Sequence, residues 1–186
     1  MDKHSPLISK IDKLALPIAK IVHRNLGFSP NKLSVTSFVI GSFSVVAVLF
    51  QKIEIALGFL LISLIFDGLD GVVARLYNLE SKTGERLELV FDRANEAMLF
   101  LALAATGYAE LRLAILAIIA ILLMTTLRDR TKFDPGFKRT ILFLGYFVGF
   151  TLALKVIFWV NLVGFIINML ILDYSRQKLL DKGVSQ

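Results

Sequence analysis

Long apolar segments constrain this chain most, because they must lie in lipid or be buried away from water. Six such segments can be drawn, each near the roughly 20 residues that a membrane-spanning helix needs. The mean hydropathy of +0.71 lies far outside the range of soluble domains. The chain is therefore predicted to be an all-α integral membrane protein. The predicted transmembrane helices are Leu33–Phe50, Ile53–Leu76, Leu87–Tyr108, Leu111–Leu127, Thr140–Leu154 and Val156–Tyr174, and the boundary between the last two rests on Lys155 alone.

Basic residues predict the orientation, because cytoplasmic loops retain Lys and Arg. With the N-terminus inside, only Lys52, Arg112 and Lys155 fall on the outer side. Both termini are therefore predicted to be cytoplasmic, in a multi-pass protein of the plasma or inner membrane. The net charge of +6 then indicates contact with the anionic lipid bilayer rather than with nucleic acid.

The chain is predicted to have three parts. Residues 1–28 are predicted to form a cytosolic N-terminus with an amphipathic interfacial helix, because apolar residues recur at helical spacing opposite lysines. A kink is expected at Pro17, and packing of this helix on protein is an open alternative. Residues 29–175 are predicted to form the six-helix transmembrane domain, and residues 176–186 a cytosolic tail.

Acidic residues occur where the second and third predicted helices approach the cytoplasm. Each would oppose insertion by about 3 kcal/mol near a helix centre. Asp67 and Asp70 share one face of the second helix, and Glu88, Asp92 and Glu96 follow at successive i+4 positions on the third. The short connection between these helices predicts that the two acidic ends meet at the inner headgroup level.

Converging carboxylates in a poorly hydrated place repel one another, so some are protonated or cations neutralise them. Oxygen ligands favour Mg²⁺, Mn²⁺ or Ca²⁺ over zinc, and two divalent ions would balance four carboxylates. Gly71, Ala74 and Gly84 leave space for a bulky ligand, and Arg75 adds a charge suited to phosphate. The alternative is that the small residues pack helices and the acidic residues face water.

This stretch resembles the signature of the CDP-alcohol phosphotransferases, Asp-x-x-Asp-Gly-x-x-Ala-Arg followed after a spacer by Gly-x-x-x-Asp-x-x-x-Asp. The segment SPNKLSVTSF also resembles the family's Pro-Asn-x-x-Thr element, with Ser34 at the threonine position. Glu88 departs from the usual aspartate and shifts the carboxylate by roughly 1.5 Å. We interpret this as a re-spaced metal site; a weakened or inactive homologue is the alternative. The matching residues are Asp67, Asp70, Gly71, Ala74, Arg75, Gly84, Glu88 and Asp92.

The resemblance implies transfer of a phosphatidyl-type group from a CDP-lipid to a polar alcohol, with release of CMP, in phospholipid biosynthesis. It implies two Mg²⁺ or Mn²⁺ ions, and Asp92 as the general base that activates the acceptor. The implied metal ligands are Asp67, Asp70, Glu88 and Asp92, and the implied lining of the CDP site is Gly71, Ala74, Arg75 and Gly84.

The basic linker LRDRTKFDPGFKR is the best indication of the acceptor. Its cations would form an anion pocket facing the metals, which favours a phosphorylated alcohol such as inositol phosphate or glycerol phosphate. Ordinary positive-inside residues are an equally weighted interpretation. Gly145 and Gly149 form a small-xxx-small pattern, which predicts close helix packing or a homodimer contact. The candidate acceptor-binding residues are Arg128, Arg130, Lys132, Lys138 and Arg139.

Three other functions compete with this hypothesis. A CDP-choline or CDP-ethanolamine type transferase acting on diacylglycerol is disfavoured by the small chain and the basic linker. A divalent-cation transporter would carry acidic residues near the midplane of several helices, often in repeated halves. A catalytically inactive homologue is suggested by Glu88 alone.

Overall fold

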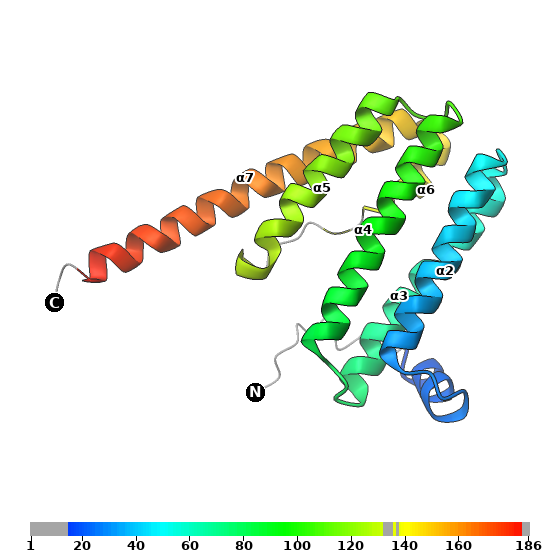
Figure 1. Ribbon diagram of the computed structural model, residues 1–186, viewed down its shortest axis with the longest axis horizontal. Helices are drawn as coiled ribbons and strands as arrows, with labels where there is room; N and C mark the ends of the chain where they lie inside the picture. The colour runs from blue at the N-terminus through cyan, green and yellow to red at the C-terminus, as the bar shows by residue number, and fades with distance from the viewer. Residues whose placement is uncertain (1–14, 132–135, 137, 184–186) are drawn as a thin grey trace. The chain divides into compact units, whose positions relative to one another are not determined.

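The computed structural model describes residues 15–131, 136 and 138–183, and within them it contains helices and no strand (Figure 1). The chain divides into two compact units, Met1–Asn95 and Glu96–Gln186, and α4 contributes to both. The elements in chain order are the π-helix η1 (Ile21–Asn25), α2 (Pro30–Leu49), α3 (Ile53–Leu76), α4 (Lys82–Ala105), α5 (Leu111–Thr131), α6 (Ile141–Val148) and α7 (Phe150–Gly183).

Four helices of the described chain are long and apolar enough to cross a membrane: α2, α3, α5 and α7. Charged residues are frequent in the first half of α4, and the eight residues of α6 rise only about 12 Å. The all-α prediction is confirmed, and the apolar helices are those of a membrane protein. The count of six transmembrane helices stays a prediction.

The predicted boundary between the last two transmembrane helices is wrong. The predicted helices meet between Leu154 and Val156, whereas the structure breaks at Gly149 and Lys155 lies inside α7. Gly149 has a φ of +93°, a conformation that a residue without a Cβ adopts readily. A single lysine does not end a helix, because its long side chain can carry the charge to water.

Gly145 lets α6 lie close against α7 in the second unit. A Cβ at this position would stand 2.9 Å from Phe150 Cδ1 and 3.0 Å from Ala153 Cβ. One glycine of the small-xxx-small pattern is thus explained by packing within a single chain. The homodimer stays a prediction.

Buried hydroxyl groups join α2 to α3, which lie side by side in the first unit (Figure 1). Ser37 Oγ donates to the Ser63 carbonyl at 2.8 Å, and Ser63 Oγ donates back to the Ser37 carbonyl at 2.9 Å. Further along, Ser44 Oγ donates to the Ala56 carbonyl at 2.8 Å. Small hydroxyl side chains allow close approach of the backbones and satisfy their own polar groups. This register places the start of α2 beside the last turns of α3.

The N-terminal segment packs on the same end of these helices. Residues 15–20 are helical through Pro17 and lead into η1, while residues 1–14 of the predicted interfacial helix lie outside the described chain. Ala19 is fully buried, whereas Ile18 and Ile21 are more than half exposed. The described part therefore packs on protein along one side. The buried cluster consists of Ala19, Leu33, Leu69, Val72 and Val73.

Gly41 provides the first stability prediction, because it lets α4 approach α2. A Cβ there would stand 2.9 Å from Cγ of the buried Asn95, whose Nδ2 donates to the Phe38 carbonyl. We expect Gly41→Ala to lower the stability by about 1–2 kcal/mol, because overpacking costs about 1–3 kcal/mol and the higher helix propensity of alanine offsets only part of it. Thermal unfolding in detergent measures this change.

Gly58→Ala in α3 is the matched control. Among the described residues, no atom outside the adjoining helix backbone lies within 4 Å of a Cβ placed there, so the same substitution should leave stability unchanged or raise it. A Gly41→Ala protein that melts as high as Gly58→Ala would contradict the close approach of α2 and α4.

Candidate functional site

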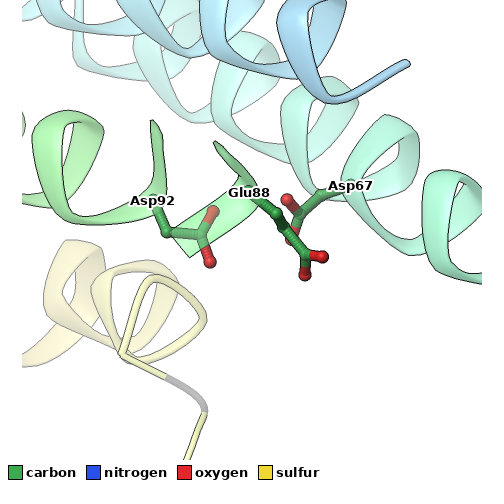
Figure 2. A group of neighbouring side chains, drawn as sticks. All are labelled: Asp67, Glu88 and Asp92. Carbon is green, nitrogen blue, oxygen red and sulfur yellow. The ribbon is translucent and has the colours of Figure 1, made fainter. Parts of the chain in front are cut away.

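Three acidic side chains from two helices of the first unit come together. Asp67 projects from α3, Glu88 and Asp92 project from α4, and one oxygen of each lies within 4.8 Å of the others (Figure 2). Glu88 and Asp92 share a helix face because they are four residues apart. All three are partly exposed. The predicted meeting of carboxylates from these helices is therefore found, although Glu96 is buried and belongs to the second unit.

A short, well-capped connection brings the two acidic helix ends together. After α3 the chain turns at Asn78, whose φ of +52° is one that asparagine tolerates. Ser81 then begins α4, because its Oγ accepts a hydrogen bond from the Gly84 amide at 3.0 Å. The polar turn therefore places Asp67 and Glu88 on neighbouring helix ends.

Asp70 is held differently from the other three carboxylates. Only 2% of it is exposed, and its Oδ2 accepts a hydrogen bond from Ser34 Oγ at 2.6 Å. Its Oδ1 is buried and has no hydrogen-bond partner in the described part of the chain. Asp70 lies outside the three-residue group but near enough for the charges of Glu88 and Asp92 to act on it.

These residues fit a hard divalent cation. Carboxylate oxygens are the ligands that Mg²⁺, Mn²⁺ and Ca²⁺ prefer, and three of them this close repel one another until positive charge intervenes. The buried Oδ1 of Asp70 is an acceptor that lacks a donor among the described residues, which is rare in proteins unless an ion or water satisfies it. The donor set is thus suited to a metal, and its ligation by all four residues stays a prediction.

Gly71 and Gly84 make room for side chains of this same chain. A Cβ on Gly71 would stand 3.1 Å from Arg75 Nη1, so the glycine seats that guanidinium against α3. A Cβ on Gly84 would stand 2.9 Å from Asn31 Oδ1 and 3.0 Å from Ser81 Oγ. Gly84 therefore brings the start of α4 against the start of α2.

Ala74 is partly buried on α3, one residue before Arg75. Its role, and that of Gly71, Arg75 and Gly84, in lining a CDP site stays a prediction.

The start of α2 contributes two residues that the sequence reasoning had not assigned to the site. Ser29 caps the helix by accepting from the Lys32 amide at 3.4 Å, and Pro30 occupies the first turn. Asn31 then contacts Gly84, and Ser34 contacts Asp70. Both belong to the segment that resembles the family's Pro-Asn-x-x-Thr element, and that resemblance is the signal that pointed to this part of α2.

The candidate acceptor-binding residues lie in the second unit. Arg128 is partly buried and Arg130 is exposed, both in the last turn of α5. Lys138 and Arg139 are only 4% and 6% exposed, and Lys132 lies outside the described residues. Buried cations require acceptors or counter-charges, and both side chains have interaction partners in the structure.

Comparison with known proteins agrees with this geometry. The family model for CDP-alcohol phosphatidyltransferase matches residues 28–170, which is well over half of the chain and contains α2 through α6. A comparison with curated proteins finds no match. The resemblance inferred from the acidic signature is confirmed.

Proposed function

The chain belongs to the CDP-alcohol phosphatidyltransferase family, and from this premise we propose that it transfers a phosphatidyl-type group from a CDP-lipid to a polar alcohol, with release of CMP. The reaction would serve phospholipid biosynthesis. The observation that carries this proposal is the cluster of Asp67, Glu88 and Asp92 at the family's acidic positions.

Asp67, Asp70, Glu88 and Asp92 would hold two Mg²⁺ or Mn²⁺ ions. When bound, such ions neutralise charge that develops on the phosphate oxygens during transfer. The three clustered carboxylates support this assignment through their proximity, and Asp70 through its buried Oδ1, which has no hydrogen-bond partner in the part of the chain that the structure describes.

Asp92 would act as the general base. Its carboxylate accepts the proton of the acceptor hydroxyl while the acceptor oxygen bonds to the lipid-linked phosphorus of the CDP-lipid. The bond from that phosphorus to the bridging oxygen breaks, and CMP leaves with the bonding electrons. The products are the phosphodiester lipid, CMP and the proton on Asp92. Asp92 is partly exposed, so a hydroxyl can reach it.

The depth of the acidic residues suits a lipid pyrophosphate. Asp67 follows Ile53 by 14 positions in α3, a rise of about 21 Å within a hydrocarbon core of about 30 Å. Its carboxylate therefore lies toward one membrane surface. The basic loops support a cytoplasmic position for that surface and for both termini. In this arrangement α4 and α6 would complete the six-helix domain of residues 29–175.

The acceptor would be a phosphorylated alcohol, such as inositol phosphate or glycerol phosphate. The buried cations Lys138 and Arg139 support this choice, because Arg binds phosphate in a bidentate manner and Lys as a point charge. Arg128, Arg130 and Lys132 would add to the positive field.

A CMP-release assay tests the proposed function. Detergent-purified protein with CDP-lipid and Mg²⁺ or Mn²⁺ receives inositol phosphate, glycerol phosphate, inositol, serine or water alone. We expect CMP release that requires metal and is fastest with a phosphorylated alcohol. Release with water alone at the same rate would contradict transfer to an alcohol.

The same assay separates the competing functions. Turnover only with CDP-choline or CDP-ethanolamine and diacylglycerol would favour the other transferase type. Metal flux in proteoliposomes without CMP release would favour a transporter. No turnover with any acceptor would favour an inactive homologue.

A further inference from the structure

We propose that Ser34 is a positioning residue that orients the Asp70 carboxylate so that Oδ1 is presented to a divalent cation. The inference rests on the proposed function, because it assigns a task to a residue beside the proposed metal ligands. It concerns a hydroxyl on α2, a helix that carries none of those ligands.

The contact between Ser34 and Asp70 joins two helices over 36 positions of sequence. The Oγ–Oδ2 distance of 2.6 Å is within the range of hydrogen bonds from a hydroxyl to a carboxylate. Both residues are buried, with 6% of Ser34 and 2% of Asp70 exposed. Water therefore does not compete readily for either partner.

The single proton of Ser34 has two possible acceptors. The Pro30 carbonyl lies 3.2 Å from Oγ, whereas Asp70 Oδ2 lies 2.6 Å away. A charged acceptor at the shorter distance forms the stronger bond, so the proton points to Asp70. The hydroxyl thus donates its hydrogen bond to Oδ2 and restricts rotation of the carboxylate.

The two oxygens of Asp70 consequently differ. Oδ2 has its donor, and Oδ1 is buried with no hydrogen-bond partner in the described chain. A buried carboxylate oxygen without a hydrogen-bond partner costs free energy unless a cation binds it. Outer partners that orient metal ligands typically change affinity by about 10–100-fold when removed.

Manganese binding tests the role of Ser34 without relying on activity. Mn²⁺ alone is titrated into detergent-purified protein, and free Mn²⁺ is followed by electron paramagnetic resonance. We expect Ser34→Ala to weaken Mn²⁺ binding at least about 10-fold. Ser34→Thr should stay within about threefold of the parent, because it retains the hydroxyl that donates to Oδ2.

Ser44→Ala is the matched control, because Ser44 is also buried and donates from α2 to α3, but to the Ala56 carbonyl. It should lower the melting temperature and leave Mn²⁺ affinity unchanged. If Ser34→Ala does not fold, Ser34→Cys replaces it, because a thiol has similar shape and is a weak donor. Ser34→Cys should also bind Mn²⁺ more weakly.

Three results would overturn the inference in distinguishable ways. Parent-like Mn²⁺ affinity in folded Ser34→Ala or Ser34→Cys would remove the role of Ser34 and leave the proposed function intact. A parent protein that binds no Mn²⁺ and releases no CMP would remove both. Equally weakened Mn²⁺ binding in Ser34→Ala and Ser44→Ala would show that the hydrogen bond between Ser34 and Asp70 contributes only to helix packing.

Discussion

Asp92→Asn should release CMP at no more than about one-thousandth of the parent rate, since a positioned general base contributes about 10²–10⁴-fold and this residue also belongs to the carboxylate cluster. An amide has nearly the same shape as the carboxylate but cannot accept the acceptor's proton. Excess Mn²⁺ should not restore turnover, because the missing function is proton transfer. Single-turnover CMP release at increasing metal concentration measures this.

Glu85→Gln is the control for Asp92→Asn. Glu85 lies in the first turn of α4 and is exposed, so the loss of its charge should leave CMP release within about twofold of the parent. Turnover in Asp92→Asn that recovers at high Mn²⁺ would show that Asp92 only binds metal and that another group takes the proton.

Glu88→Gln should weaken Mn²⁺ binding by at least about 100-fold. Its oxygen lies within 4.8 Å of oxygens of Asp67 and Asp92, so the cluster loses one of three neighbouring charges. Two unit charges about 4 Å apart near a protein surface interact by about 4 kcal/mol, and each 1.4 kcal/mol is about tenfold in affinity. Mn²⁺ titration of the parent and the variant measures the difference.

The Glu88→Asp variant distinguishes a re-spaced metal site from a weakened or inactive one at the position where the family usually has aspartate. The structure shows that the longer side chain reaches the cluster, so we expect the shorter one to withdraw its oxygens by roughly 1.5 Å and bind Mn²⁺ more weakly. CMP release that is absent in the parent and present in Glu88→Asp would instead identify a degenerate site.

Hydropathy located the apolar helices better than it located their ends. The predicted range Ile53–Leu76 is the range of α3. The apolar residues begin where the helix begins, and the helix ends at a polar turn. Predicted starts at Leu33 and Leu87 were late, because α2 begins at the Ser29 cap and α4 at Lys82. Hydropathy detects contact with lipid, whereas a helix begins where its first amides find acceptors.

The last hairpin shows the opposite error, in which a charge was given too much weight. The charge of Lys155 predicts a helix end, but the conformation that breaks the helix belongs to Gly149. A charge can be carried to water from inside a helix, whereas a positive φ cannot be accommodated within one.

The amino-acid order alone determined the membrane class, the family and the two helix ends that carry the carboxylates, because lipid solubility and i+4 spacing are local properties of the chain. Tertiary structure alone decided that Asp67, Glu88 and Asp92 form one cluster while Asp70 turns to Ser34, 36 positions away. It also decided that Gly71 and Gly84 accommodate Arg75 and Asn31. These contacts between side chains depend on which faces of the helices meet, and the packing of side chains between the helices determines which faces do.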